Sequence, residues 1–348
     1  MPSSNATVAS KASIGAKANT IDLDDYIPKG LRSLEDLQTA IPSLAKDPKS
    51  LDEIRAAVGE VPTVHDLLLG DARMMPELSP KSVHLVLTSP PYWTLKKYRN
   101  TEGQMGHIED YEQFLSDLDT VWQRCYDALV PGGRLVCVVG DVCLSRRKNG
   151  GRHTVVPLHA AIQERCRHIG YDNLAPIIWH KISNAIYEVA GGSSFLGKPF
   201  EPNSVIKNDI EFILLERKPG GYRKPTSAAR ILSVISGENH QKWFQQIWMG
   251  LTGASTRKHP APFPIELAER LIQMFSFVGD TVLDPFLGTG TTSAAAAQCG
   301  RNSIGYEIDE KYLQLATKRM SDLEQNFFST TTTRVLDKHP TRSDTKSF

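Results

Sequence analysis

Short apolar runs alternate with longer amphipathic stretches along most of this chain, and this alternation constrains the fold more than any other feature. The runs at 64–69, 82–87 and 134–139 each lead into a Gly-Asp or Pro-rich turn, as buried strands do. Between the last two, residues 111–129 place apolar side chains at the spacing of a helix with one buried face. Strands that alternate with helices form a parallel sheet covered on both faces, so the sequence predicts an α/β fold of about seven strands.

The remaining elements continue this pattern on both sides of an irregular stretch at 217–258. Short helices are expected at 31–43 and 49–58, ahead of the first strand. Residues 1–20 and the chain from about 329 onward are polar and lack periodicity, which predicts disordered tails. The other predicted elements are a helix at 155–168, strands at 174–179 and 210–215, a helix at 265–275, a strand at 281–284, a helix at 291–299, a strand at 302–306 and a helix at 309–325.

Composition excludes several classes of protein. No stretch approaches about 18 consecutive apolar residues, and the polar N-terminus lacks the apolar core of a signal peptide. We therefore expect a cytoplasmic protein without a membrane anchor. The five cysteines are odd in number and form no CxxC or CxxH pair, which argues against a disulfide framework and against a metal site; they are Cys125, Cys137, Cys143, Cys166 and Cys299.

The net charge of +1 conceals an uneven distribution along the chain. Residues 141–260 hold 17 Lys+Arg and 9 Asp+Glu, a balance of +8, which leaves 23 against 30, or −7, for the rest. A basic segment between acidic flanks favours a polyanion, such as nucleic acid, as partner. A solvated basic surface is an equally simple interpretation.

A glycine-rich turn follows the predicted strand at 281–284. Its sequence, D-P-F-L-G-T-G-T-T at 284–292, leads directly into a predicted helix. The glycines let the backbone approach a ligand closely, and the helix N-terminus offers free N–H groups. Nineteen residues after Gly288, at the end of the next strand, stands Glu307, where a carboxylate accepts hydrogen bonds from both ribose hydroxyls of an adenosine-containing ligand. An ordinary helix-start turn is the alternative, but the added strand and acid favour a nucleoside site.

The residues around the turn discriminate among nucleoside ligands. No Lys-Ser/Thr pair follows the glycines, which excludes a phosphate-binding P-loop. Ser293 replaces the third glycine of a dinucleotide fingerprint, and the acid Asp284 precedes the turn. An acid there favours a ligand with a positive charge, such as the amino group of a methionine moiety, over a pyrophosphate. The sequence therefore predicts S-adenosylmethionine as the cofactor.

The motif T-S-P-P-Y-W, residues 88–93, ends another predicted strand. Its two prolines fix two φ angles, so we expect the carbonyl of Pro90 and the hydroxyl of Ser89 to face a pocket as acceptors. Tyr92 offers a ring on which a planar base stacks. Hydrogen bonds to an exocyclic amine draw its nitrogen toward a tetrahedral form that attacks a methyl sulfonium, and proximity supplies most of the remaining rate. The glycine turn in the same chain disfavours the alternative of a Pro-rich turn with a core tyrosine.

Together the two motifs resemble those of the amino-methylating DNA methyltransferases, in the permuted, beta-type order in which the catalytic motif precedes the cofactor motif. The resemblance runs from about residue 63 to residue 325. It implies a doubly wound, Rossmann-like methyltransferase sheet, circularly permuted, with an inserted DNA-recognition region. Further segments match in the family's order, namely Gly70-Asp71, residues 103–111, Pro131-Gly132-Gly133, Trp179-His180-Lys181, Trp248 and residues 259–264.

Carried over residue by residue, the resemblance implies three sets of site residues and no metal. The residues expected to hold the target base are Ser89, Pro90, Pro91 and Tyr92. Those expected to bind S-adenosylmethionine are Asp71, Asp284, Phe286, Gly288, Gly290, Thr291, Glu307, His259 and Phe263. Those expected to contact DNA are Lys96, Lys97, Arg99, Lys181, Lys198, Arg223 and Lys224.

The family methylates either N4 of cytosine or N6 of adenine. Ser89, where adenine enzymes usually carry Asp, and the segment H-P-A-P-F-P at 259–264 resemble the cytosine-N4 group more closely, with adenine N6 as the nearest alternative. Methylation of cytosine C5 needs a cysteine nucleophile, normally after a proline, and no cysteine has that setting. A non-catalytic nucleic-acid-binding protein and an RNA methyltransferase are further alternatives, and the complete S-P-P-Y motif argues against the first.

The expected partners are double-stranded DNA with a short recognition sequence and a restriction endonuclease acting on the same site. Because the target amine is paired inside a duplex, the base has to be flipped out. The predicted domains are a tail at 1–20, a helical extension at 21–60, a catalytic half at 61–183, a DNA-recognition region at 184–258 with a strand near 209–217, a cofactor half at 259–326 and a tail at 327–348.

Overall fold

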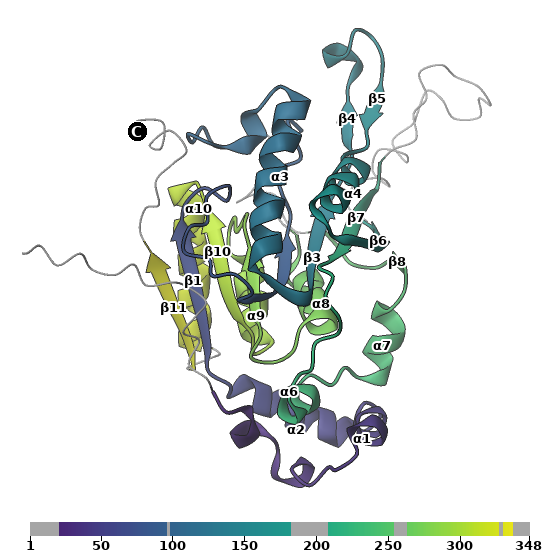
Figure 1. Ribbon diagram of the computed structural model, residues 1–348, viewed down its shortest axis with the longest axis vertical. Coiled ribbons are helices and arrows are strands. Elements are labelled where there is room, and N and C mark those ends of the chain that lie inside the picture. The colour runs from purple at the N-terminus through teal and green to yellow at the C-terminus, as the bar shows by residue number, and fades with distance from the viewer. Residues whose placement is uncertain (1–20, 96–97, 182–207, 254–262, 327–329, 337–348) are drawn as a thin grey trace, which may run out of the picture.

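The computed structural model describes residues 21–95, 98–181, 208–253, 263–326 and 330–336. Within these residues, nine strands form one large sheet at the centre of the molecule (Figure 1). In spatial order the strands are β11 (Thr331–Leu336), β1 (Thr63–Leu69), β10 (Asn302–Glu307), β9 (Thr281–Asp284), β2 (Val83–Thr88), β3 (Leu129–Val139), β7 (Ile210–Arg217), β6 (Asp172–His180) and β8 (Ile247–Trp248). The seven predicted strands are the central seven, and β11 and β8 extend the two edges.

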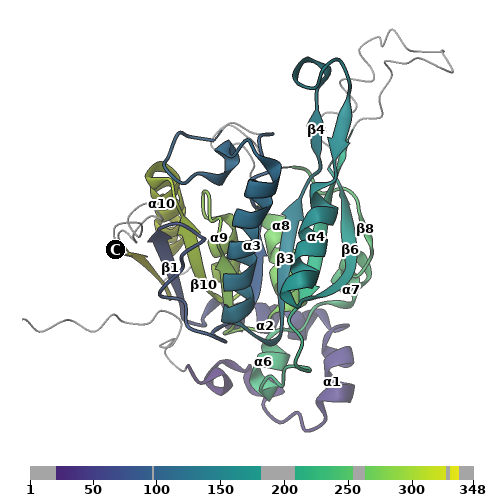
Figure 2. The same ribbon diagram turned by 45° about the horizontal axis from the view of Figure 1, so that its top comes forward.

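Helices cover both faces of this sheet (Figures 1 and 2). Two pack on one face around the buried ring of Trp122, and three form the layer on the opposite face. Along β2 the side chains alternate, so that Val86 joins the first layer and Leu85 the second. The predicted two-faced α/β sheet is therefore confirmed. The first layer consists of α3 (Tyr111–Ala128) and α4 (Leu158–Ile169), the second of α8 (Ile265–Phe275), α9 (Thr291–Gln298) and α10 (Glu310–Asn326).

The direction of winding reverses between two neighbouring strands. The chain passes from β9 to β10 on one side, and from β2 to β3 on the other. β9 and β2 pair directly and in parallel, with Leu85 opposite Val282. Only β7, among the strands of this sheet in the described part of the chain, runs antiparallel to its neighbours. In such sheets ligands bind outside the carboxyl ends of the strands at the reversal point, which here lies at Thr88 and Asp284.

A separate helical layer lies at the amino ends of the strands (Figure 1). It contains α1 (Leu37–Leu44), α2 (Pro48–Gly59) and α6 (Ser227–Leu232), whose apolar side chains, among them Ile54 and Ile231, form one cluster. The irregular stretch predicted at 217–258 is therefore partly wrong, because α6, α7 (Gly237–Trp243) and β8 lie in it. These elements are short and bury few side chains each, so they leave little periodicity in the sequence.

Two further elements correct the sequence prediction. β4 (Val142–Leu144) and β5 (Thr154–Val156) form an antiparallel hairpin that projects beyond the carboxyl ends of the sheet (Figures 1 and 2), so the helix predicted from 155 begins only at Leu158. β11 lies in the segment predicted as a tail. It pairs in parallel with β1, and Arg334 on it forms a two-pronged ion pair with Asp66. Its threonines favour extended backbone, but as an exposed edge strand it lacks an apolar pattern.

No helix in the described part of the chain is long and apolar enough to cross a membrane.

Candidate active site

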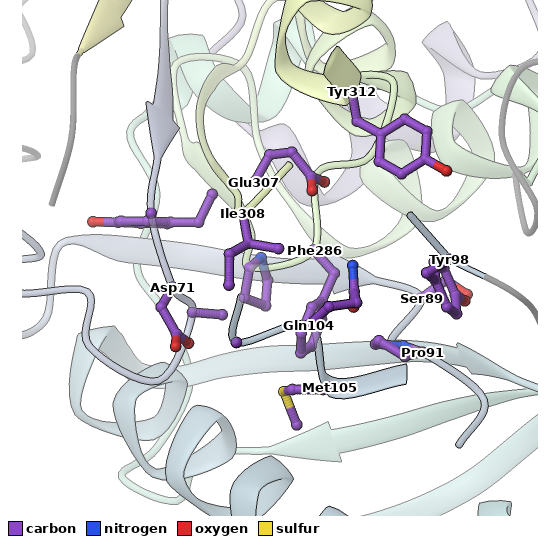
Figure 3. Close-up of a pocket in the computed structure, with 15 residues that line it drawn as sticks. Asp71, Ser89, Pro91, Tyr98, Gln104, Met105, Phe286, Glu307, Ile308 and Tyr312 are labelled. Carbon is purple, nitrogen blue, oxygen red and sulfur yellow. The ribbon is translucent and has the colours of Figure 1, made fainter. Parts of the chain in front are cut away.

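A pocket opens at the carboxyl ends of the strands, where the two sequence motifs meet (Figure 3). It holds about 530 Å³ of empty space, part of it open to solvent, within the roughly 300–1,000 Å³ of small-molecule sites. Of the predicted site residues, Asp71, Ser89, Pro91, Phe286 and Glu307 line it. The other lining residues are Gly70, Ala72, Tyr98, Gly103, Gln104, Met105, Pro285, Tyr306, Ile308 and Tyr312.

Glu307, at the end of β10, is the buried acid of this pocket. One carboxylate oxygen accepts a hydrogen bond from the N–H of Gly288 at 2.8 Å, and the other accepts from the N–H of Asp309 at 2.9 Å. Burial raises the pKa of Glu307 to about 8 in spite of these donors. A carboxylate has about four acceptor positions, so each oxygen keeps one for a ligand hydroxyl. The arrangement therefore suits a pair of adjacent hydroxyls, such as those of a ribose.

The two glycines of the turn have different structural roles. Both have positive φ, 54° at Gly288 and 77° at Gly290. Gly288 donates to Glu307, whereas a Cβ on Gly290 would lie 3.0 Å from the Cβ of Ala316 on α10. Thr291 likewise faces α10, since its hydroxyl oxygen accepts a hydrogen bond from Arg319 at 2.7 Å. Gly290 and Thr291 thus support the turn by packing against α10. They were predicted to bind the cofactor, but they do not line the pocket.

Asp284 lies below the pocket rather than in its wall. Its Oδ1 accepts hydrogen bonds from the hydroxyl of Thr88 at 2.7 Å and from the N–H of Phe286 at 3.0 Å, and its Oδ2 accepts from the hydroxyl of Thr292 at 2.6 Å. Burial raises its pKa to about 6. In this conformation Asp284 does not line the pocket in which the predicted contact with a charged ligand would be made. Instead, the side chain ties the strand of the catalytic motif to the cofactor turn.

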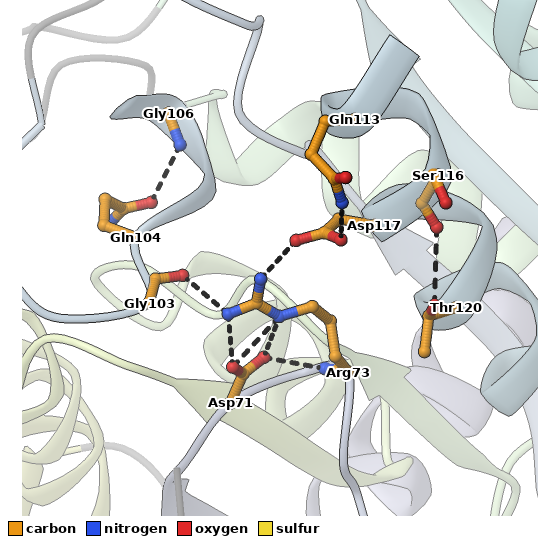
Figure 4. Close-up of polar contacts among 9 residues, drawn as sticks. All are labelled: Asp71, Arg73, Gly103, Gln104, Gly106, Gln113, Ser116, Asp117 and Thr120. Atoms are coloured by element: carbon orange, nitrogen blue, oxygen red, sulfur yellow. Dashed lines mark hydrogen bonds and ion pairs between the residues drawn. The ribbon is translucent and has the colours of Figure 1, made fainter. Parts of the chain in front are cut away.

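Asp71, at the end of β1, is held by an arginine (Figure 4). The guanidinium of Arg73 donates to both oxygens of Asp71, at 2.5 to 3.0 Å, and also pairs with Asp117 on α3. Its Nη2 donates in addition to the carbonyl of Gly103 at 3.0 Å. Arg73 therefore joins β1, α3 and the loop that follows the catalytic motif. Asp71 and Arg73 are neighbours in the sequence, but no local pattern indicates that Gly103 and Asp117 join them, because these lie 30 and 44 positions from Arg73.

The catalytic motif forms a tight turn after β2. Ser89 donates a hydrogen bond to the hydroxyl of Tyr92 at 3.3 Å, and that hydroxyl donates to the carbonyl of Val138 at 3.3 Å. Tyr92 is only 5% exposed and does not line the pocket, so the predicted stacking surface for a base is covered in this conformation. Trp93 has a φ of 46°, which costs free energy outside glycine and occurs mostly at functional sites.

The loop after the catalytic motif covers one side of the pocket. Tyr98 packs against Gly106 so closely that a Cβ there would overlap its ring. Thr101 donates to Asp309 at 2.6 Å, which ties the loop to the end of β10. Among the lining residues that were not predicted as site residues, Ile308 could have been predicted from the sequence, because it directly follows Glu307. Tyr312 could not, since it reaches the pocket from the first turn of α10.

Several predicted site residues do not meet at the pocket. Phe263 is buried with Trp248 in the core on the other face of the sheet, away from the pocket wall. Pro90 is buried within the turn but does not line the pocket. The predictions for His259, Lys96, Lys97 and Lys198 fall outside the described residues.

Of the four predicted DNA contacts in the described part of the chain, three are engaged within the protein. Arg99 pairs with Asp309 at 3.3 Å, and Lys181 pairs with Glu211 at 2.6 Å. Arg223 forms a two-pronged ion pair with Asp280, directly before β9, so it and the exposed Lys224 lie at the amino end of the sheet, opposite the pocket. At this position Arg223 and Lys224 lie too far from the pocket to contact DNA that is bound there.

Most of the cysteines are unsuited to act as nucleophiles. Four of the five, Cys125, Cys137, Cys166 and Cys299, are buried, and burial raises the pKa of each thiol above its usual value. A protonated, enclosed thiol cannot form the covalent intermediate that methylation on carbon needs. Within the described ranges, no cluster of His, Cys, Asp and Glu is suited to a metal ion.

A doubly wound sheet of this order, with a nucleoside-type pocket at its reversal point, is the arrangement of the Rossmann-like methyltransferases. The sequence profile of the DNA methylase family matches residues 83–318, more than half of the chain. The chain therefore belongs to this family of DNA amino-methyltransferases. The predicted family and fold class are confirmed.

Relatives agree with this assignment. The type II methyltransferase M.MjaI of Methanocaldococcus jannaschii is 40% identical over 279 residues, which cover 72% of this chain and 89% of that protein. M.MthZI of Methanothermobacter thermautotrophicus, also a type II methyltransferase, is 34% identical over 282 residues, 75% of this chain and 77% of that protein. The chain thus spans most of the length of both relatives.

A solved structure is similar in both sequence and fold. TTHA0409, a putative DNA modification methylase from Thermus thermophilus, is 50% identical and superimposes with a TM-score of 0.65 over 79% of this chain and 99% of that one. It was crystallised with S-adenosyl-L-methionine, which confirms the predicted cofactor at the level of the family. The pocket fits that cofactor, because Glu307 keeps free acceptor positions for ribose hydroxyls and Phe286, Ile308 and Met105 supply apolar walls for a ring.

Proposed function

We propose that this protein transfers a methyl group from S-adenosylmethionine to the exocyclic N4 amine of a cytosine flipped out of duplex DNA. The observation that supports it best is that Ser89 of the catalytic turn and Glu307 of the cofactor strand open into one pocket. Family membership and the type II methyltransferase relatives support DNA as the substrate. Those relatives also support a role beside a restriction endonuclease that acts on the same sequence.

The hydrogen bonds of Ser89 prepare it to accept. The Ser89 hydroxyl donates its hydrogen bond to the Tyr92 hydroxyl, which in turn donates to the carbonyl of Val138. The lone pairs of the Ser89 oxygen are therefore left for an N–H of the base amine, which Ser89 holds with its nitrogen directed at the cofactor side of the pocket. In this arrangement Tyr92 is a positioning residue that orients the Ser89 hydroxyl. Burial keeps its phenol protonated, because it raises the Tyr92 pKa well above the usual value.

The cofactor side of the pocket binds and orients its ligand. Glu307 accepts from the ribose hydroxyls, and Phe286, fixed edge-on against Trp122 at 6.3 Å, gives the adenine an apolar neighbour. When bound, S-adenosylmethionine supplies an electrophilic methyl group that is attacked without a covalent enzyme intermediate. Asp284 keeps the two sides in register, since it is hydrogen-bonded to Thr88 and to the cofactor turn at once.

The identity of the base rests on one side chain. The position next to the two prolines carries Ser89 rather than an acid, which supports cytosine N4 over adenine N6. The test is to methylate plasmid DNA with isotopically labelled S-adenosylmethionine and to separate the nucleosides by chromatography. We expect the label in N4-methylcytosine. Label in N6-methyladenine would overturn the choice of base, and label in RNA but not in DNA would overturn the proposed function.

A further inference from the structure

The β4–β5 hairpin, which projects beyond the carboxyl end of the central sheet, carries a cluster of positively charged residues. Its tip and flanks contain Arg146, Arg147, Lys148 and Arg152, and no Asp or Glu occurs between Asp141 and Glu164. The backbone of the tip stands in open space, because a Cβ on Gly150 or Gly151 would meet nothing within 4 Å. Arg147 and Arg152 are both exposed. Four of the 17 Lys and Arg of residues 141–260 therefore belong to this one element.

Other cations of the basic segment are used inside the protein. Six of them form ion pairs with acids, namely Arg165 with Glu112 and Asp119, Arg167 with Glu164, Lys181 with Glu211, Arg217 with Asp172, Arg223 with Asp280, and Lys242 with Glu238. Lys218 instead donates to the carbonyls of Tyr126 and Leu129. Among the described residues, Arg147 and Arg152 have no ion pair. In the described part of the basic segment, two exposed arginines without an ion pair therefore lie together on the hairpin.

The base of the hairpin is fixed beside the catalytic turn. It begins after Gly140, where a Cβ would lie 3.3 Å from the ring of Tyr92. Asp141 pairs with His159 at 2.7 Å, and the His159 ring stacks on Phe212 at 3.7 Å. The hairpin therefore extends in a defined direction from the same edge of the sheet that holds the pocket (Figure 2).

We propose that this hairpin is a clamp that binds the phosphate backbone of duplex DNA through Arg147 and Arg152. The inference rests on the proposed function, and it assigns the docking of DNA to an element other than the segments predicted from the sequence. A two-stranded ribbon with a basic tip fits the grooves of B-form DNA, and arginine pairs with phosphate through two N–H groups. Contacts to phosphate position the duplex without reading its sequence, so the hairpin sets affinity and register and not the recognition sequence.

The test compares variants of equal charge change. Arg147→Gln/Arg152→Gln removes the clamp, whereas Lys29→Gln/Lys46→Gln removes two exposed lysines from the layer at the opposite end of the sheet. Binding of a labelled random-sequence duplex is measured by fluorescence anisotropy between about 50 and 200 mM salt. For the clamp variant we expect Kd to rise roughly tenfold and the slope of log K against log salt to fall in magnitude by about 1.8, at about 0.9 per phosphate contact. The lysine variant should keep the wild-type slope.

Further readouts separate the possible outcomes. Unchanged affinity for S-adenosylmethionine by calorimetry shows that the clamp variant is folded, and a raised KM for DNA at unchanged kcat supports the clamp. Arg147→Lys/Arg152→Lys, which keeps the charge, should restore most of the affinity. If the wild-type protein methylates DNA but the clamp variant keeps the wild-type Kd and salt slope, the clamp is overturned and the proposed function stands. Wild-type protein that neither binds nor methylates duplex DNA would overturn the proposed function.

Discussion

The two ends of the central sheet contain buried carboxylates in opposite situations. At the amino end, Asp280 is neutralised by the two-pronged ion pair with Arg223 and also accepts from the N–H of Phe277. At the carboxyl end, Asp284 and Glu307 are held by hydroxyl and backbone donors, and burial raises the pKa of both. A carboxylate paired with a cation serves the stability of the fold. Of Asp284 and Glu307, only Glu307 lines the pocket, so its remaining acceptor positions are available to a ligand.

The arginines differ in the same way. Arg223 at the amino end is engaged in an ion pair, while Arg147 on the projecting hairpin is exposed. Both belong to the same basic segment of the sequence, and both contribute equally to its charge. The uneven charge favoured a polyanion as partner but left a solvated surface equally possible. The paired or unpaired state of each side chain, in contrast, distinguishes cations that stabilise the fold from cations that are free to contact a partner. The experiments below test whether the division between a functional and a structural end holds.

The largest effect is expected at the catalytic turn. Ser89→Ala should lower kcat for methyl transfer roughly 100- to 1,000-fold, because it removes the acceptor that orients the base amine. Single-turnover kinetics with labelled cofactor measures this. Affinity for S-adenosylmethionine should stay within about twofold of the wild type. Ser43→Ala, an exposed serine of the amino-end layer, is the control. Loss of cofactor binding in Ser89→Ala would place Ser89 in the wrong half of the pocket.

A smaller effect is expected at the cofactor strand. Glu307→Gln should raise the Kd for S-adenosylmethionine roughly 30- to 100-fold, since hydrogen bonds to a charged acceptor are worth about 1.5–3 kcal/mol each. Isothermal calorimetry gives the Kd. Glu310→Gln alters an exposed acid at the start of α10 and should leave it unchanged. An unaltered Kd in Glu307→Gln would refute the ribose contact.

The raised pKa of Glu307 predicts that ligand binding depends on pH. Ribose hydroxyls donate to the ionised carboxylate, so binding lowers its pKa and releases a proton at pH values below about 8. Affinity should therefore rise roughly fivefold from pH 7 to 8 and about a further twofold from pH 8 to 9, where it levels off. Adenosine is the suitable probe, because it lacks the titratable groups of methionine. A flat profile for the wild type, equal to that of Glu307→Gln, would contradict the assignment.

The smallest effect on function is expected at the amino end. Arg223→Gln should lower the free energy of unfolding by about 2 kcal/mol, because it leaves the carboxylate of Asp280, whose side chain is 8% exposed, without its cation. Denaturant unfolding monitored by circular dichroism measures this. DNA affinity distinguishes the two roles. An unchanged Kd for DNA assigns Arg223 to stability. A raised Kd would restore the DNA contact predicted from the sequence and would contradict the division between a functional and a structural end of the sheet.

The parts of the site that could be predicted are those carried by local sequence. The helix at 265–275 was predicted with its observed limits, and the seven central strands of the sheet were all predicted. These predictions succeeded because apolar periodicity and turn chemistry act over a few residues. The acid at the end of β10 was found for the same reason, since the spacing from glycine turn to acid is set by one helix and one strand.

The parts that could not be predicted depend on contacts between distant segments. Arg73 lies two residues from Asp71, but its ion pair with Asp117 depends on the packing of α3 beside the end of β1. Asp284 has the residue type expected of a ligand contact, yet two hydroxyls turn it toward the core. Arg223 and the hairpin arginines are indistinguishable in sequence, because neither an ion pair with Asp280 nor exposure at a tip leaves a local pattern.

The pairing of β2 with β9 also affects the order of events during synthesis. Thr88 and Asp284, which meet through a hydrogen bond, are 196 positions apart in the chain. At the usual rate of about 5–20 residues per second, the catalytic strand waits roughly 10–40 s on the ribosome for its neighbour. During that interval one edge of β2 is open to incorrect pairing, and the cofactor turn does not yet exist. We therefore expect a nascent chain to be inactive until β9 and the cofactor turn have been synthesised and have paired with β2.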